Sequence, residues 1–163
     1  VWLQGTAGTP SFLMCRLLID ADGCPVVAEA VRLAQEFSLS CIIFCDTAHE
    51  IYHPGVETRI VSKGPDSVDF ALVHQLLRGD IVITQDYGLA AMCLTRGAYC
   101  LNQDGMRYSA DNIDALLSMR HTAAKIRRVG GRLKGPAKRT ATQNLTFSTE
   151  LEALLRTLIP PKL

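Results

Sequence analysis

The chain has 163 residues, of which 48% are hydrophobic and 20% charged, and its formal net charge is +1. This composition is typical of a globular domain with one core and excludes an intrinsically disordered chain. No apolar run approaches the roughly 20 residues that a membrane-spanning helix requires, and the first residues lack the features of a secretory signal peptide. We therefore expect a cytoplasmic protein that has no membrane partner.

The first half of the chain alternates between strand-like and helix-like patterns. Short runs rich in strand-forming residues, CRLLI, CIIFC and TRIVS, predict strands at 15–19, 41–45 and 58–62. Between them, apolar residues that recur every three or four positions predict a helix over 26–37. A second helix is expected over 66–78, where a glycine follows directly.

The second half continues the same alternation. We expect a fourth strand at 81–84, a helix over 87–96 and a fifth strand at 98–101. A long helix is expected over 110–129, before a pair of glycines. The last helix is predicted over 149–159, because its first residue is followed three positions later by glutamate, as in a capping box.

Strands that alternate with helices predict an α/β fold, a three-layer sandwich around a five-stranded parallel sheet. We interpret residues 1–13 as a non-core N-terminal extension and residues 14–163 as a single domain. In such sheets, ligands bind beyond the carboxyl ends of the strands.

Acidic residues stand where this rule places a site. Asp20 and Asp22 follow the first predicted strand, Asp86 follows the fourth, and Asp66 and Asp69 open the second helix. If the first and fourth strands are neighbours, these carboxylates converge and repel one another unless a cation neutralises them. Oxygen ligands of this kind suit Mg²⁺ or Mn²⁺, which can support hydrolysis of a phosphodiester.

A structural explanation also exists for these residues. Aspartate is common at helix starts and in turns, where its side chain accepts hydrogen bonds from backbone N–H groups. Asp66 fits that role best, because it stands at the predicted start of a helix.

The positive charge is concentrated near the C-terminus. Eight of the 17 basic residues lie between Ala115 and Thr149, where there is no acidic residue. Such a segment can be a solvated helix face, but its glycine-rich loop also suits contact with a phosphate backbone. We expect the partner to be nucleic acid, RNA in particular. The predicted nucleic-acid-binding residues are Arg120, Arg127, Arg128, Arg132, Lys134, Lys138 and Arg139.

Five motifs carry a resemblance to a known family: "IDADGCPV", "GPDSVDFAL", "DIVITQDYGLAA", "LNQDGMRYSADNI" and "GGRLKGP". In this order they resemble the YaiI/YqxD family of uncharacterised bacterial proteins, which is regarded as similar to PIN-like domains. The resemblance implies the strand order 3-2-1-4-5. It also implies that Asp20, Asp69 and Asp86 are catalytic and hold Mg²⁺ or Mn²⁺, supported by Asp22 and Asp66. PIN-like domains usually carry glutamate at the helix position, where this chain has aspartate.

These observations favour a metal-dependent nuclease-like domain that acts on RNA or single-stranded nucleic acid. One alternative is a non-catalytic nucleic-acid-binding or regulatory module with a degenerate site. Another is a phosphatase of the haloacid dehalogenase type, whose Asp-x-Asp motif resembles residues 20–22, although Gly23 and Cys24 depart from that motif. A homo-oligomer is left open.

The six cysteines form no CxxC pair, and no Cys or His spacing matches a zinc site. Because most of the cysteines lie within apolar runs, we expect reduced and buried thiols.

Overall fold

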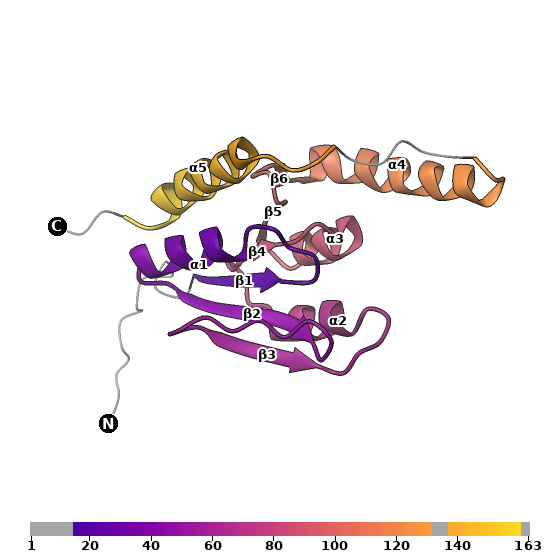
Figure 1. The fold of residues 1–163 in the computed structure, drawn as a ribbon. Coiled ribbons are helices and arrows are strands. Elements are labelled where there is room, and N and C mark those ends of the chain that lie inside the picture. The colour runs from indigo at the N-terminus through magenta and orange to yellow at the C-terminus, as the bar shows by residue number, and fades with distance from the viewer. Residues whose placement is uncertain (1–14, 132–136, 161–163) are drawn as a thin grey trace, which may run out of the picture.

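Six strands form one sheet in the order β3-β2-β1-β4-β5-β6 in the computed structural model, which describes residues 15–131 and 137–160 (Figure 1). The strands are β1 (Arg16–Asp20), β2 (Ser40–Asp46), β3 (Glu57–Val61), β4 (Ile81–Ile83), β5 (Tyr99–Leu101) and β6 (Arg107–Tyr108). The helices are α1 (Val27–Glu36), α2 (Ser67–Gln75), α3 (Tyr87–Thr95), α4 (Ala110–Arg128) and α5 (Ala141–Leu158).

The predicted order 3-2-1-4-5 is confirmed, because β1 pairs in parallel with both β2 and β4. The prediction of a purely parallel five-stranded sheet was incomplete. Strand β6 pairs antiparallel with β5, with Tyr108 opposite Cys100. Its two residues are too few to show any strand periodicity in the sequence.

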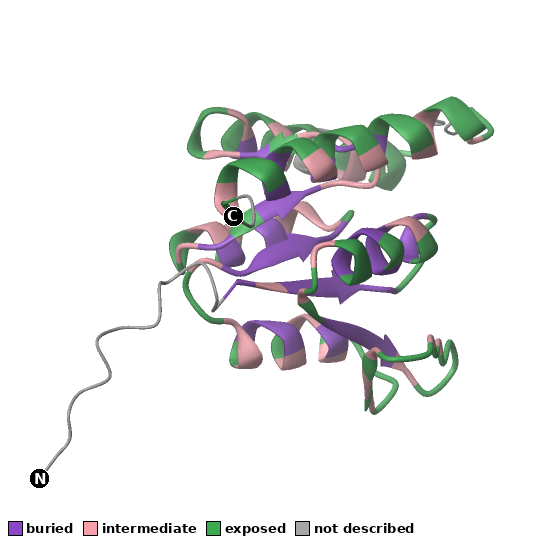
Figure 2. Ribbon diagram, turned by 90° about the vertical axis from the view of Figure 1, so that its left-hand side faces the viewer, coloured by how far each residue is buried: buried purple, intermediate pink, exposed green. Residues whose placement is uncertain are grey.

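Helices cover both faces of the sheet, which confirms the three-layer sandwich. Leu17 and Ile19 of β1 point to the face covered by α1 and α5, whereas Leu18 points to the face covered by α2, α3 and α4. The central strands are therefore buried on both sides, as Figure 2 shows. Burial on both faces explains why β1 and β4 read as unbroken aliphatic runs.

Two helix ends differ from the sequence-based expectation. Helix α2 ends at Gln75 rather than at residue 78, because the Asp80 carboxylate accepts a 2.8 Å hydrogen bond from the Leu77 N–H and holds the chain in a turn. Helix α5 begins at Ala141, eight residues before the predicted start.

The capping box of α5 is formed by Thr140 and Gln143. The expected capping residue, Thr149, lies inside the helix, where its hydroxyl donates to the Leu145 carbonyl. Ser/Thr-x-x-Glu/Gln occurs at both places, and only the packing of the whole helix distinguishes them.

A buried ion pair lies at the amino end of the sheet. Asp80 is fully buried and accepts hydrogen bonds from Arg16 at 3.2 Å (Nε) and 2.7 Å (Nη2). The same guanidinium donates to the Gln75 carbonyl. This carboxylate is neutralised by an arginine, as buried charges usually are.

The six cysteines, all within the described part of the chain, are free thiols, five of them buried and Cys24 half-buried. The expectation of buried thiols is confirmed for five of the six, and burial raises the pKa of Cys24 to about 11. None of the helices in the described part of the chain has the length and hydrophobicity of a membrane-spanning segment. The predicted extension, residues 1–13, lies outside the described residues.

Candidate functional site

An acidic cleft of about 310 Å³ lies at the carboxyl edge of the sheet. Its walls are the turns that follow β1, β2 and β4 and the first turn of α2. Six of the residues that line it are aspartates: Asp20, Asp22, Asp46, Asp66, Asp69 and Asp86. The structure therefore brings all five predicted acidic residues together and adds a sixth.

Asp20, the last residue of β1, is the most buried acid of the cleft, with 7% of its surface exposed. Its Oδ2 accepts a 2.7 Å hydrogen bond from the Thr84 hydroxyl, and its carboxylate also accepts from the Asp22 N–H. Burial nevertheless raises the pKa of Asp20 to about 6, and the neighbouring charges of Asp22 and Asp86 add to this. No described Lys or Arg forms an ion pair with it, in contrast to Asp80.

Thr84 joins the ends of β1 and β4. Its hydroxyl oxygen donates to Asp20 and accepts a 3.0 Å hydrogen bond from the Asp86 N–H. Asp86 is the N-cap of α3, and its Oδ1 accepts from the Leu89 N–H at 3.1 Å. Asp86 is therefore both a helix cap and a wall of the cleft, so the structural and functional interpretations of this residue are compatible.

The first turn of α2 forms the opposite wall of the cleft. Asp66, the residue before the helix, has a φ of 59°, a left-handed conformation that aspartate tolerates better than most residues. Its side chain caps none of the described N–H groups of α2, so the simple capping role is not what the structure shows. Asp69 follows one turn later and lines the same cleft.

Asp46 was missed by the sequence analysis. It ends β2, the other neighbour of β1, and therefore reaches the same edge of the sheet. Its Oδ1 accepts hydrogen bonds from the backbone N–H groups of Ala48 and His49 and contacts His49 Nδ1 at 3.1 Å. Desolvation raises the pKa of Asp46, but the His49 side chain and these donors outweigh it and lower the pKa. The signal was present, because an acid directly follows the run "CIIFC".

Two tyrosines support the cleft from β6 and α3. The Tyr108 hydroxyl donates a 3.1 Å hydrogen bond to the Thr84 carbonyl, and its ring meets Tyr87 edge-on at 6.0 Å between centroids. On the other side, Gln85 Nε2 donates to the Gly23 carbonyl at 2.7 Å and ties the loop after β4 to the loop after β1. These interactions fix the two loops that carry the acids following β1 and β4.

The donor set of the cleft consists of carboxylate oxygens, which suits Mg²⁺ or Mn²⁺ rather than a softer metal. Within residues 15–131 and 137–160, however, no group of three or more His, Cys, Asp or Glu side chains is arranged to hold an ion. Magnesium commonly keeps several waters and uses only one or two protein carboxylates. The chemistry of the residues therefore fits such an ion, although the side chains do not form a closed cage.

The predicted basic residues fall into three groups. Arg127 and Arg128 are exposed at the C-terminal end of α4, and Lys138 is exposed before α5. Arg132 and Lys134 lie outside the described residues, as does the side chain of Arg120.

Arg139, in contrast, has partners within the fold. Its guanidinium donates to Asp104 Oδ1 at 2.6 Å, to the Gln103 carbonyl at 2.5 Å and to Asn144 Oδ1 at 2.6 Å. It joins the turn between β5 and β6 to the start of α5. These hydrogen bonds give Arg139 a structural role that the sequence analysis did not foresee.

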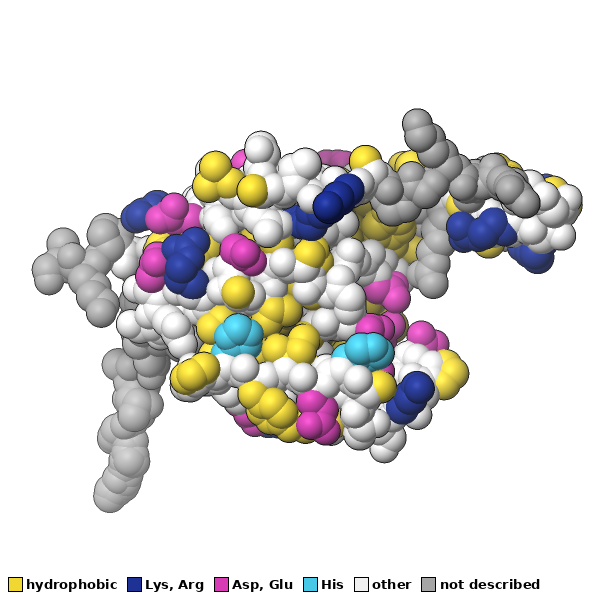
Figure 3. Space-filling view, viewed as in Figure 1, with side chains coloured by type: hydrophobic (Ala, Val, Ile, Leu, Met, Phe, Trp, Pro, Cys, Tyr) yellow, Lys and Arg dark blue, Asp and Glu magenta, His cyan; other side chains and the backbone are white. Residues whose placement is uncertain are grey.

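Helix α4 projects beyond the body of the protein, on the side to which the strands of the sheet point (Figure 1). In Figure 3, acidic side chains gather at this end of the body, and Lys and Arg side chains lie on the underside of the projecting helix. The acidic cleft and the basic helix therefore lie at the same end of the molecule.

Comparison with known proteins places the chain in a family. Residues 18–157 match the family described as "Uncharacterized BCR, YaiI/YqxD family". A UPF0178 protein of Exiguobacterium sibiricum is 45% identical over 140 residues, which cover 86% of this chain and 96% of that protein. A UPF0178 protein of Clostridium acetobutylicum is 44% identical over 146 residues, covering 88% and 96%. No solved structure matches the chain significantly. With a match that extends from β1 into α5, the chain belongs to the YaiI/YqxD family.

Proposed function

We propose that the acidic cleft binds Mg²⁺ or Mn²⁺ and that the protein is a metal-dependent nuclease acting on RNA or single-stranded nucleic acid. One observation carries the proposal: the ends of three adjacent strands and the start of α2 place six aspartates around one cleft. Without a cation, such a concentration of like charge is unfavourable. The order 3-2-1-4-5, which the resemblance to PIN-like domains implied, agrees with it.

Within this proposal, Asp20 and Asp86 are the principal ligands. The Thr84 hydroxyl holds the Asp20 carboxylate in place, and the Leu89 N–H holds that of Asp86. Both side chains are therefore already ordered before a cation binds. Asp69 completes the set of predicted catalytic acids from α2, and Asp22 and Asp66 assist from the rim. When bound, the ion supplies charge stabilisation and a water of lowered pKa at the phosphodiester.

The basic residues of α4 have a separate task in the proposal. Arg127 and Arg128 are exposed at the end of the projecting helix and lie at the same end of the molecule as the cleft. Contacts between such side chains and phosphates hold a strand without reading its sequence. Their attraction also offsets the repulsion that the acidic cleft exerts on a polyanion.

The test is cleavage of end-labelled single-stranded RNA and DNA with Mg²⁺, Mn²⁺ or chelator. We expect cleavage by the wild type only with metal, and a loss of about 100-fold or more in Asp20→Asn and Asp86→Asn. Asp111→Asn, a change at an acid on the first turn of α4 and outside the cleft, is the matched control. Cleavage that persists in chelator would contradict the proposal, and so would cleavage by both cleft variants at the wild-type rate.

A second candidate is the non-catalytic nucleic-acid-binding module. Two observations favour it: no described trio of ligands is arranged to hold an ion, and the helix position carries aspartate. It predicts that the wild type binds single strands with a strong salt dependence but cuts none of them with any metal. The same cleavage assay, combined with a binding titration, separates the two candidates.

A further inference from the structure

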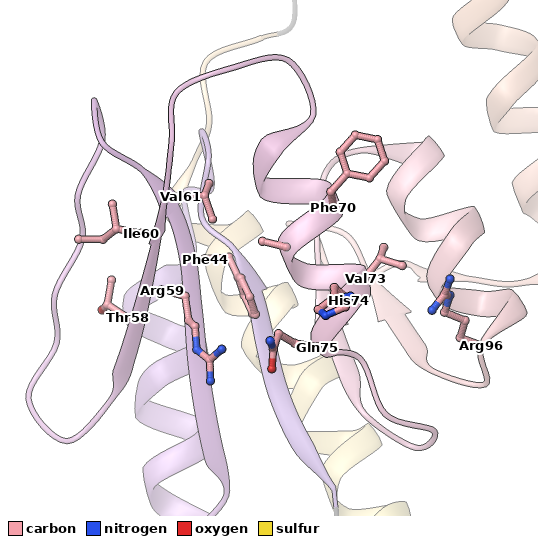
Figure 4. Close-up of a pocket in the computed structure, with 11 residues that line it drawn as sticks. Phe44, Thr58, Arg59, Ile60, Val61, Phe70, Val73, His74, Gln75 and Arg96 are labelled. Atoms are coloured by element: carbon pink, nitrogen blue, oxygen red, sulfur yellow. The ribbon is translucent and has the colours of Figure 1, made fainter.

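A groove of about 910 Å³ between β3 and α2 is larger than the acidic cleft, which measures about 310 Å³. In Figure 4, Arg59 and Val61 of β3 point into this groove, Phe44 of β2 lies at its floor, and His74 and Gln75 come from α2. Helix α2 packs more extensively over β2 than over β3, and the groove lies along β3 on this face of the sheet.

Phe70 connects the groove to the acidic cleft. Phe70 is 66% exposed and lines both the groove and a smaller hollow of about 360 Å³ between α2 and α3. That hollow is also lined by Met92, and it shares Asp66, Asp69 and Asp86 with the acidic cleft. The smaller hollow therefore shares a wall with the acidic cleft, and Phe70 is common to the smaller hollow and the groove.

The core does not explain the position of Phe70. Helix α2 turns Val68, Leu72 and Val73 inward, and these three side chains are its buried residues. Figure 4 shows the Phe70 ring on the outer side of the helix. A single exposed apolar side chain needs no special explanation. Phe70 differs because it lies at a junction of concave surfaces and follows an acid of the cleft directly in the chain.

The charge of the groove suits an anion. Arg59 and Arg96 line it together with His74, and none of its described lining residues is acidic, whereas six aspartates line the neighbouring cleft. Arg59 also forms a 2.9 Å ion pair with Glu57, and the side chains of this pair are 41% and 51% exposed. Exposed pairs of this kind contribute little stability and exchange readily for a phosphate.

A flat aromatic ring, a methionine and nearby cations are the elements that bind unpaired nucleobases. Base–aromatic stacking contributes about 1–3 kcal/mol per base and tolerates any sequence, because every base has a flat face. A duplex cannot use such a ring without unstacking, which costs a few kcal/mol per step. The surface therefore discriminates in favour of a single strand.

We propose that Phe70, together with Met92, is a nucleobase-stacking subsite beside the acidic cleft, and that the strand continues into the β3–α2 groove, where Arg59, His74 and Arg96 meet its phosphates. This inference rests on the proposed function for the direction of the strand and names its substrate as single-stranded. It assigns a role to residues for which the sequence analysis predicted none.

The experiment compares Phe70→Ala with the wild type by fluorescence anisotropy, in Mg²⁺ and in chelator. The probes are a labelled oligoadenylate and an abasic strand of the same length. Phe70→Ala should weaken binding of the oligoadenylate about tenfold, the value expected for loss of one stacked base. The wild type should bind the abasic strand more weakly than the oligoadenylate, and Phe70→Ala should not alter the affinity for the abasic strand. Phe70→Trp should restore the affinity for oligoadenylate.

Tyr52→Ala is the matched control, because Tyr52 is also aromatic and 65% exposed but lines none of these three hollows. It should leave both affinities within about twofold of the wild type. Thermal melts of all variants verify that the fold is retained. Equal binding by Phe70→Ala and wild type, an equal loss for the abasic strand, or no binding of either probe by the wild type would overturn the subsite.

Cleavage of the oligoadenylate in the same samples separates this inference from the proposed function. If the wild type cleaves the oligoadenylate with metal, and Phe70→Ala changes neither the binding affinity nor the cleavage rate, the subsite is excluded and the nuclease proposal is retained. Phe70-dependent binding with no cleavage by the wild type would retain the subsite and remove the nuclease.

Discussion

The Thr84 hydroxyl donates a 2.7 Å hydrogen bond to Asp20 Oδ2, and so links the end of β4 to the end of β1. Both residues are buried, Thr84 with 1% and Asp20 with 7% of its surface exposed. Because the same hydroxyl oxygen accepts from the Asp86 N–H, it fixes two acids of the cleft at once. Thr84 was not predicted as a site residue, although it lies only two positions before Asp86 in "VITQD".

Thr84→Val removes this hydroxyl while keeping the shape of the side chain. The Asp86 N–H loses its acceptor and the Asp20 carboxylate loses a donor. We expect a loss of about 1–3 kcal/mol in the free energy of unfolding at neutral pH, and a further rise in the pKa of Asp20. Urea unfolding and an NMR titration of the Asp20 carboxyl carbon measure the two effects. Thr95→Val, at an exposed hydroxyl on α3, is the control, and equal losses in both variants would show that the cleft hydroxyl has no special role.

Asp20→Asn should stabilise the protein in chelator, and the gain should depend on pH. Burial raises the folded-state pKa of Asp20 from 3.8 to about 6, so the folded protein holds a proton that the unfolded chain has lost. Wild-type stability therefore falls as the pH rises through this window, by at most about 3 kcal/mol for a shift of this size. The advantage of Asp20→Asn should be small near pH 4 and reach its full value above pH 6.

Unfolding curves for both proteins at several pH values measure this difference. Asp111→Asn, at an exposed acid on α4, is the control for the loss of one carboxylate outside the cleft. An Asp20→Asn variant that is less stable than the wild type at neutral pH would indicate that Asp20 is a structural cap instead.

Asp86→Asn separates capping from metal binding, because asparagine caps a helix about as well as aspartate. In chelator the variant should melt close to the wild type. Mn²⁺ should raise the melting temperature of the wild type, since a ligand of the native state stabilises it by about 2.7 kcal/mol at 100 times its Kd. The response of Asp86→Asn should be much smaller. Thermal melts and calorimetric titration with Mn²⁺ measure both, and identical responses would exclude Asp86 as a ligand.

The basic residues should contribute to the free energy of unfolding only where they have hydrogen-bond partners in the fold. Arg139→Ala removes hydrogen bonds to Asp104, Gln103 and Asn144 and should lower the free energy of unfolding by about 1–3 kcal/mol. Arg127→Ala and Arg128→Ala, at exposed positions, should change it by less than about 0.5 kcal/mol.

In binding of single-stranded RNA, the changes at Arg127 and Arg128 should matter and the change at Arg139 should not. The combined change at Arg127 and Arg128 should flatten the slope of log affinity against log salt by about 0.7 for each phosphate that the protein no longer neutralises. Arg139→Ala should leave that slope unchanged wherever the variant remains folded. If the changes at Arg127 and Arg128 leave the slope of log affinity against log salt unchanged, the projecting helix does not contact the phosphates.

The sequence determined those features that depend on local composition. Apolar runs identify β1, β2 and β4, because strands buried on both faces carry mostly apolar side chains. Their order in the sheet was implied by the family resemblance, not by the runs themselves. Asp20 and Asp86 could be placed at one edge of the sheet because each follows such a run closely, and parallel strands end at the same edge.

Only the tertiary structure decided which residues meet across long stretches of the chain. Strand β6 is stable through its pairing with β5, and Tyr108 reaches the Thr84 carbonyl only in the folded sheet. Arg139 is distinguished from its basic neighbours by Asp104, which lies 35 residues earlier in the chain. Phe70 stands in the apolar stretch "VDFALV", and its exposure follows from how α2 packs on β2. Such interactions depend on pairing energies between distant segments, which no local pattern of residues encodes.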